Sequence, residues 1–270
     1  MPELPEVETS VQAIQEFAGQ NIESIKINNP NLRWKLDSLA FSKLKKQRVK
    51  TIDRRAKYIL FKLEKNIVLI HLGMTGTLRI AEKNSNFYKK HDHIEFIFLK
   101  NKLIFNDPRR FGSMHIISDP NKHFLLKELG VEPLSKEFNE EYLFHRIKKS
   151  LSPIKTALMN QKHVVGIGNI YASEILFDAK IRPTRKSRTL TKKEMARITT
   201  SSKKILKKAI EAGGTTLQDF YKPDGNKGYF KIDLAVYDRA NQKCKTCQKE
   251  TIKRIVQSQR ATFYCRECQV

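Results

Sequence analysis

The chain has 270 residues, enough for one large domain or two of ordinary size. Lysine and arginine number 52 against 28 acidic residues, so the formal net charge is +24. A field of this sign attracts polyanions, and nucleic acid is the first partner to consider, although solvated lysines can account for part of the excess. No apolar run reaches membrane-spanning length, and the acidic N-terminus lacks the apolar stretch of a signal peptide, so we expect a cytosolic protein without a membrane partner.

The N-terminus reads Met1-Pro2-Glu3. Removal of Met1 would give Pro2 a free secondary amine, which can attack an electrophilic carbon and form a cationic imine. An α-amine titrates near pH ~8, against ~10.4 for a lysine, so more of it is nucleophilic at neutral pH. Glu3 and Glu6 can supply acid–base chemistry beside it. While Met1 remains, the Pro2 nitrogen is acylated and cannot act as a nucleophile.

The same opening also fits an ordinary helix start, because proline is tolerated in the first turn and acidic residues favour the helix dipole. Helical spacing of apolar residues predicts a helix from Pro5 to Ala18, and its inward face would carry Val7, Val11, Ile14 and Phe17. The two interpretations are compatible, since a helix N-terminus disfavours the ammonium form of a nearby amine.

Eight short β-rich runs follow, separated by polar residues. Short strands at this regular spacing predict an antiparallel sandwich or barrel. The runs are 22–27, 49–53, 58–63, 67–72, 78–81, 94–99, 102–105 and 113–117.

The composition changes after Gly130, where a linker at 132–135 leads into helical periodicity. The pattern predicts a helical domain, and its last helix is long, basic and amphipathic and stops at Gly213-Gly214. The expected helices are 137–150, 154–161, 172–177 and 191–212.

All four cysteines lie near the C-terminus, in two Cys-x2-Cys pairs separated by 17 residues. This spacing predicts a tetrahedral Zn²⁺ site, and four protein ligands would make it structural rather than catalytic. Two disulfides are the alternative, which a cytosolic location disfavours. The expected ligands are Cys244, Cys247, Cys265 and Cys268.

Between the two pairs, the β-branched run 251–256 and the run 261–264 predict a hairpin. Arg260 would lie near its tip, where it could contact a phosphate; a solvated arginine is the alternative.

Several turns could hold DNA. Asn106 to Gly112 would project Arg109, Arg110 and Phe111, and His71 to Gly76 would present Met74. Exposed apolar side chains can act as wedges that unstack bases. The sequence pattern alone slightly favours the alternative, in which Met74 and Phe111 are buried core residues.

Three further segments are candidates for DNA binding. The glycines in Gly166 to Asn169 would let the backbone approach a phosphate, although tight helix packing is the better explanation of the glycines taken alone. Lys57 follows a basic cluster at a strand start and could reach a phosphate. The glycine-rich segment 213–229 is long enough to be a recognition loop, or an ordinary surface loop.

Together these motifs resemble the formamidopyrimidine-DNA glycosylase family, bacterial enzymes that remove oxidised purines such as 8-oxoguanine and formamidopyrimidines. The resemblance spans the whole chain, in order and spacing. It rests on PELPEVET, RRAKY, HLGMTG, NDPRRFG, GIGNIYASE, GGTTLQDF and the four cysteines.

The resemblance implies a role for each matching position. Pro2 would form the imine with the damaged nucleotide and cleave the strand by β,δ-elimination. Glu3 would act as general acid. Lys57 and Arg260 would contact phosphates and assist the elimination steps. The remaining candidates would support the catalytic site or contact DNA. Met74, Arg109 and Phe111 would fill the space of the extruded nucleotide. For His91, a solvated histidine without a role is the alternative. These remaining candidates are Glu6, Met74, His91, Arg109, Arg110, Phe111, Lys155 and Asn169.

The resemblance also implies the architecture, α+β and multidomain. An N-terminal antiparallel β-sandwich flanked by helices (1–130) would carry the catalytic residues. A helix–two-turn–helix domain (131–230), with a lesion-recognition loop at about 213–229, would precede a zinc-finger hairpin (231–270). We expect a monomer that binds damaged double-stranded DNA in the bacterial nucleoid, with one structural Zn²⁺ and no nucleotide cofactor.

Two other functions stay open. One is the sister enzyme for oxidised pyrimidines, endonuclease VIII, but that relative typically has glycine where this chain has Leu4. The other is a non-catalytic zinc-finger protein, which would need the charge, the clamp and the finger but no free Pro2.

Overall fold

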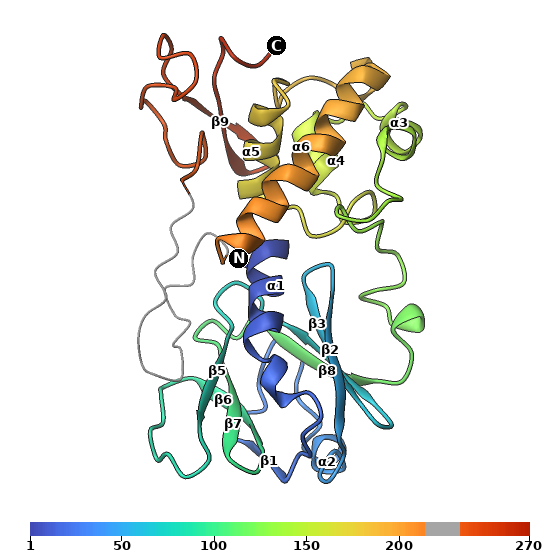
Figure 1. Ribbon diagram of the computed structural model, residues 1–270, viewed down its shortest axis with the longest axis vertical. Helices are drawn as coiled ribbons and strands as arrows, with labels where there is room; N and C mark the ends of the chain where they lie inside the picture. The colour runs from blue at the N-terminus through green and yellow to red at the C-terminus, as the bar shows by residue number, and fades with distance from the viewer. Residues whose placement is uncertain (214–232) are drawn as a thin grey trace. The chain divides into compact units, whose positions relative to one another are not determined.

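The computed structural model describes residues 1–213 and 233–270, and these form two compact units that we treat separately. The first unit holds Met1–Lys127, and the second holds residues 128–212 and 233–270 (Figure 1). The helical part and the finger thus lie in one unit. The three-part division remains a prediction, because its boundary at 230 lies outside the described residues. Among the described residues, no helix is long and apolar enough to cross a membrane.

The first unit contains two four-stranded antiparallel sheets, which confirms the sandwich rather than the barrel. One sheet has the order β1-β6-β7-β5 and the other β2-β3-β4-β8. All eight expected runs form strands. They are β1 Ser24–Ile27, β2 Val49–Arg55, β3 Tyr58–Leu63, β4 Ile67–His71, β5 Thr77–Glu82, β6 Asp92–Ile97, β7 Asn101–Asn106 and β8 Ser113–Ile117.

Helix α1 covers Leu4–Ala13 and is shorter than the expected helix from Pro5 to Ala18. At Ile14 the backbone leaves helical geometry, and a 3₁₀ turn, η1 Gln15–Phe17, completes the segment. The expected apolar face is nevertheless buried in the core of this unit, with Phe17 packed 4.4 Å from Phe98 between ring centroids. A short helix, α2 Ser38–Ser42, was not expected; Asp37 caps it by accepting a bond from the Ala40 amide. Between β8 and α3 lies one 3₁₀ turn, η2 Pro120–Lys122.

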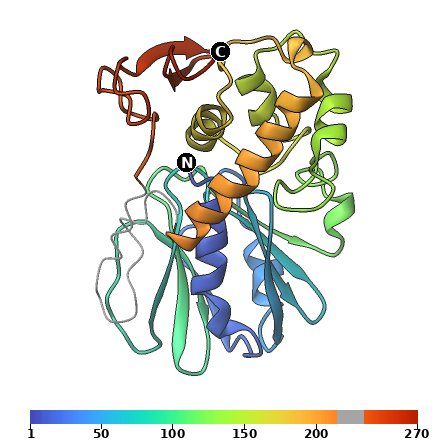
Figure 2. The same ribbon diagram turned by 45° about the horizontal axis from the view of Figure 1, so that its top comes forward.

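The second unit begins with helices packed around their own core. They are α3 Glu140–Ile147, α4 Ile154–Met159, α5 Asn169–Asp178 and α6 Lys192–Glu211, with a 3₁₀ turn η3 Ser187–Thr189 before α6. Strands β9 Lys253–Gln257 and β10 Arg260–Tyr264 form the expected hairpin, drawn in red in Figures 1 and 2. Its inner side packs with Phe177 of α5, so helices and finger share apolar contacts.

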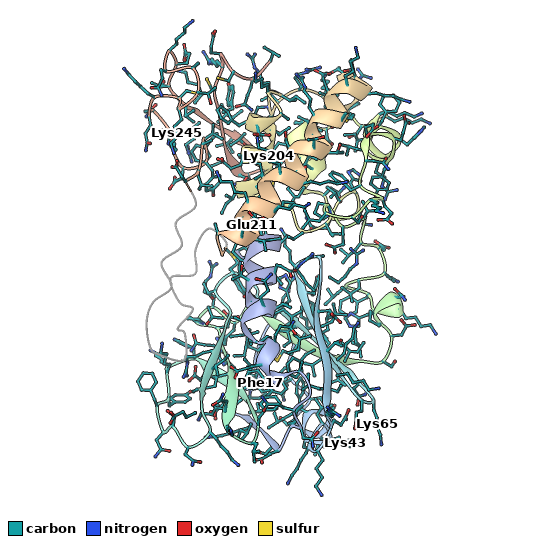
Figure 3. All side chains as sticks on the ribbon, viewed as in Figure 1. Phe17, Lys43, Lys65, Lys204, Glu211 and Lys245 are labelled. Carbon is teal, nitrogen blue, oxygen red and sulfur yellow. The ribbon has the colours of Figure 1, made fainter. Side chains whose placement is uncertain are left out.

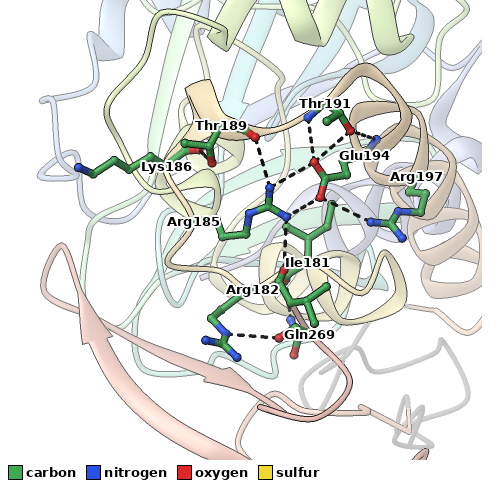
Figure 4. A network of polar contacts seen from close by, with 10 residues as sticks. Ile181, Arg182, Arg185, Lys186, Thr189, Thr191, Glu194, Arg197 and Gln269 are labelled. Atoms are coloured by element: carbon green, nitrogen blue, oxygen red, sulfur yellow. Dashed lines mark hydrogen bonds and ion pairs between the residues drawn. The ribbon is translucent and has the colours of Figure 1, made fainter.

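A polar network fixes the start of α6 (Figure 4). Thr191 and Glu194 form a capping box, and the Glu194 carboxylate also accepts from Arg185. Arg182 Nε donates to the backbone carbonyl of Gln269, the second-last residue of the chain. The loop before α6 therefore anchors both the helix and the C-terminal residues of the finger.

Candidate functional site

The residue after Pro2 is held by the cap of α1. Glu3 is the N-cap residue, and its amide donates to Glu6 Oε2 at 2.9 Å. Both carboxyl residues are buried, at 3% and 5% exposure, while Met1 is 50% exposed. The helix cap thus fixes the backbone beside Pro2, while Met1 remains accessible for removal.

Lys57 lies in the tight turn between β2 and β3, where Ala56 adopts a positive φ of 55°. The turn is fastened to α1, because Arg54 Nε donates to Glu8 at 2.7 Å while its Nη1 donates to the Ala56 carbonyl at 3.0 Å. Lys57 is only 7% exposed. The turn and the N-terminal helix are therefore held in one fixed arrangement.

Asp107, which is fully buried, joins the turn at 106–112, which carries Arg109, to the turn at 71–76, which carries Met74. Its Oδ1 accepts from Thr75 Oγ1 at 2.5 Å, and its Oδ2 accepts from the Gly112 amide at 2.7 Å. Gly73 has φ +67°, and a Cβ there would lie 2.4 Å from the Gly112 nitrogen, so only glycine permits this approach. Sequence reasoning gave Asp107 and Thr75 no role, because their contact spans 32 positions.

Met74 and Phe111 are exposed, at 42% and 45%, which corrects the alternative that places them in the core. The guanidinium of Arg109 lies 4.7 Å from the centroid of the Phe111 ring, a cation–π contact. Arg110 is exposed and has φ 56°. The structure therefore brings Met74, Arg109 and Phe111 onto two adjoining loops of the same unit.

His71 is the first residue of the loop at 71–76 that carries Met74, which we call the methionine loop. No role was expected for His71 from the sequence. Its Nδ1 accepts from the Gly73 amide at 3.1 Å, which requires a neutral ring at that nitrogen. The pKa of His71 is lowered from 6.5 to about 4, mainly by burial and also by the positive charges of Lys57 and Arg33. The loop is thus supported by an imidazole that stays neutral at physiological pH.

The backbone of His91 contacts the loop at 106–112 that carries Arg109, which we call the arginine loop. The His91 carbonyl accepts from the Asp107 amide at 3.1 Å. His91 has φ 76°, and its ring lies 6.4 Å from that of His93. The structure thus places His91 near the loop without showing a role for its side chain.

In the second unit, the glycine turn before α5 is shaped by Gln161. Its Oε1 accepts from the Gly166 amide at 2.8 Å, and its Nε2 donates to the Ile167 carbonyl at 3.0 Å. Gly166 has φ 80°, so the turn requires glycine, and Gly168 is the N-cap of the helix that begins at Asn169. Lys155 lies beside this turn and donates to Asn169.

Arg260 is the first residue of β10 and is exposed. The preceding Ser258 and Gln259 both have positive φ, 46° and 60°, as in a type I′ hairpin turn. This two-residue turn holds Arg260 at the tip, as expected. The expected loop at 213–229 lies outside the described residues except for Gly213, which has φ 78°.

The four cysteines gather into one cluster with their sulfur atoms within 4.8 Å of one another. The Cys244–Cys268 and Cys247–Cys265 sulfur pairs are 3.8 and 3.7 Å apart, too far for disulfides. Tetrahedral Zn–S bonds of ~2.3 Å would put sulfurs about 3.8 Å apart, so this arrangement fits a metal ion. Backbone donors at Glu250 and Lys249 lower the pKa of Cys247 to about 7, whereas burial raises the pKa values of Cys265 and Cys268, so the sulfur distances carry the argument for a metal site.

Many lysines lie on the outer surface of each unit, Lys43 and Lys65 on the first and Lys204 and Lys245 on the second (Figure 3). Several are partly neutralised, for example Lys204 by Asp178 at 2.6 Å. Solvated surface lysines therefore account for part of the net charge.

Comparison with known proteins gives a consistent match. A family model described as formamidopyrimidine-DNA glycosylase N-terminal domain matches residues 1–114, and one described as formamidopyrimidine-DNA glycosylase H2TH domain matches 129–221. The formamidopyrimidine-DNA glycosylase of Hydrogenovibrio crunogenus is 46% identical over 100% of this chain and 96% of its own length. That of Ruthia magnifica is 44% identical over the full length of both.

Solved structures agree. The Lactococcus lactis protein in complex with DNA containing Fapy-dG is 33% identical, covers 99% of both chains and has a TM-score of 0.88. The same protein in complex with DNA containing an abasic site gives the same identity, coverage and TM-score.

Proposed function

Because the chain belongs to the formamidopyrimidine-DNA glycosylase family, we propose that it excises oxidised purines from damaged DNA and then cleaves the strand at the abasic site. One observation of geometry supports this most directly. The Glu6 carboxylate holds the amide of Glu3, the residue after Pro2, in a chain that matches the family over its whole length.

Pro2, freed of Met1, is the proposed nucleophile. Its amine attacks C1′ of the damaged nucleotide, a bond forms between the Pro2 nitrogen and C1′, and the base leaves with the proton that the Pro2 nitrogen gives up. Glu3 donates a proton to the sugar ring oxygen as the ring opens, which leaves a cationic imine between Pro2 and the open sugar.

Strand cleavage then follows from the acidity that the imine gives to C2′. Loss of the C2′ proton expels the 3′ phosphate, and a second elimination expels the 5′ phosphate. Hydrolysis of the remaining imine returns the amine of Pro2. Lys57 and Arg260 are proposed to contact the phosphates that leave.

The first unit is proposed to fill the space of the extruded nucleotide. Extrusion costs a few kcal/mol of stacking and pairing. Met74 and Phe111 are exposed apolar side chains on two joined loops, and the Arg109 guanidinium lies against the Phe111 ring. This fits a wedge that replaces lost stacking. Arg110 and His91, next to it, are proposed to contact the DNA backbone.

The second unit is proposed to hold the backbone near the lesion through Asn169 and Arg260, one at a helix start and one at a hairpin tip. Since its substrate is the chromosome, we place the protein in the bacterial cytoplasm with the nucleoid, acting as a monomer.

The cysteine cluster is proposed to hold one structural Zn²⁺. The sulfur distances fit, and four thiolates leave no position open for substrate. When bound, the ion supplies only cross-linking of the two Cys-x2-Cys turns. The hairpin between them keeps Arg260 at its tip.

Two duplexes test the function, one with 8-oxoguanine opposite cytosine and one with thymine glycol. The methionine-free protein should excise 8-oxoguanine at least tenfold faster and become covalently attached to it in borohydride. Faster release of thymine glycol would favour the pyrimidine enzyme. Binding without any attachment would favour the non-catalytic alternative.

A further inference from the structure

Lys155 occupies an unusual position for a lysine. It is the second residue of α4, and its side chain is only 1% exposed, among the largest fully buried side chains of the protein. Its Nζ lies where three elements of the second unit meet. It donates to Asn169 Oδ1 at the start of α5 at 2.6 Å, and on β10 to Thr262 Oγ1 at 2.7 Å and the Ala261 carbonyl at 3.0 Å. Three acceptors match the three N–H donors of an ammonium group.

The contact with Asn169 fixes which end of its amide faces outward. An ammonium can only donate, so the atom that it meets at 2.6 Å must be the amide oxygen. The Nδ2 group then lies at the opposite end of a half-buried side chain. A phosphate that approaches Asn169 would meet a donor, which attracts it, and not a second acceptor, which repels it.

The other two contacts hold the strand directly behind Arg260. Ala261 and Thr262 are the next residues of β10, and Thr262 is fully buried. One ammonium group therefore links Asn169 and the strand that carries Arg260, although these lie 14 and more than 100 positions away in the chain. Both are proposed phosphate contacts.

We infer that Lys155 is a positioning residue, which sets the direction of the Asn169 amide and the place of the β10 strand behind Arg260. This is more specific than the DNA-binding role near the lesion that the family resemblance implies for it. The inference rests on the proposed function. Without the ammonium, the terminal torsion of Asn169 has two nearly equivalent orientations, and one of them presents oxygen to the phosphate.

A double-mutant cycle tests this. The dissociation constant is measured for a duplex with a tetrahydrofuran abasic analogue, using Lys155→Met, Asn169→Ala, the double variant and the exposed control Lys193→Met. We expect Lys155→Met and Asn169→Ala each to raise the dissociation constant about tenfold. The double variant should have a dissociation constant no higher than that of the single variant that binds less tightly. The control should bind like the wild type. If the double variant loses about a hundredfold in affinity, so that the two single losses multiply, the inference is overturned.

A second measurement is made on the wild-type protein and needs a variant only for the assignment of the signal. In ¹⁵N NMR of the wild-type protein, the ammonium protons of Lys155 should exchange slowly enough with water to give a signal, because all three have acceptors. The signal should shift in Asn169→Ala. An Nζ signal that is lost to fast exchange in the wild type would overturn the inference.

The two proposals fail in different ways. If the wild type binds the tetrahydrofuran duplex no better than an undamaged duplex, and forms no covalent adduct with lesion DNA, the proposed function fails. If it binds selectively and forms the adduct while the losses multiply, only the role of Lys155 fails.

Discussion

Thr75 donates its hydroxyl to Asp107 at 2.5 Å and so joins the two loops that carry Met74 and Phe111. Asp107 is fully buried and also accepts from the Gly112 amide. Replacing it with alanine would leave the buried Gly112 amide and the half-buried Thr75 hydroxyl without this acceptor. Asp107→Ala should lower the free energy of unfolding by about 3 kcal/mol and slow excision of 8-oxoguanine.

Urea unfolding measures the first effect and single-turnover cleavage the second. Asp119→Ala, which removes only the cap of the 3₁₀ turn η2, is the control and should cost about 1 kcal/mol or less. An Asp107→Ala protein as stable as this control would show that the link between the loops carries little energy.

The exposed position of Phe111 separates its effect on stability from its effect on DNA. Phe111→Ala should change the free energy of unfolding by less than about 0.5 kcal/mol, yet slow excision at least tenfold. Phe105, fully buried in the same unit, is the matched control, and Phe105→Ala should cost about 3–5 kcal/mol. Equal losses of stability for the two phenylalanines in thermal or urea unfolding would contradict the exposed placement.

Acid should weaken the methionine loop through His71. Burial lowers the pKa of the folded ring to about 4 from an ordinary value of 6.5, so the unfolded chain binds more protons between these values. The contribution of His71 to stability is therefore complete above pH 6.5 and is lost as the pH falls toward 4. A shift of this size corresponds to roughly 3 kcal/mol.

His71→Asn keeps an acceptor near the Gly73 amide but does not titrate, so it should flatten this part of the pH–stability curve. His145→Gln, at an exposed site, should leave the curve unchanged. The ¹⁵N shifts of the His71 ring measure its pKa directly, and a value near 6.5 would refute the assignment.

Removal of the metal should weaken DNA binding while leaving the first unit folded, since that unit has a core of its own. Cys268→Ala should lose the single expected Zn²⁺ and bind damaged duplex at least tenfold more weakly, because the hairpin that carries Arg260 loses its cross-link. Metal content by mass spectrometry and a binding titration measure the two effects. Full zinc content with unchanged affinity would exclude the proposed ligand set.

The sequence predicted the regular elements well where local pattern determines them. Strands β3 and β8 have the expected bounds, because apolar runs with sharp polar ends are a local signal. The five-residue helix α2 was missed, since one turn shows no periodicity. The cysteine cluster could be predicted because its ligand spacing is itself local.

Roles that depend on distant contacts could not be predicted in this way. Nothing near Asp107 in the chain indicates that it joins Thr75, and nothing near Lys155 indicates that it reaches strand β10. The exposure of Met74 was also undetermined, because an apolar residue in a turn can point into a core or into solvent. Folding decides such cases through packing with residues far away in sequence.

Mass spectrometry of the protein–DNA adduct reduced by borohydride tests the central claim most directly. The account predicts that the protein lacks Met1 and that a deoxyribose remnant from the 8-oxoguanine duplex is attached to the nitrogen of Pro2. A modification on a lysine, or an adduct formed equally well by protein that retains Met1, would contradict it.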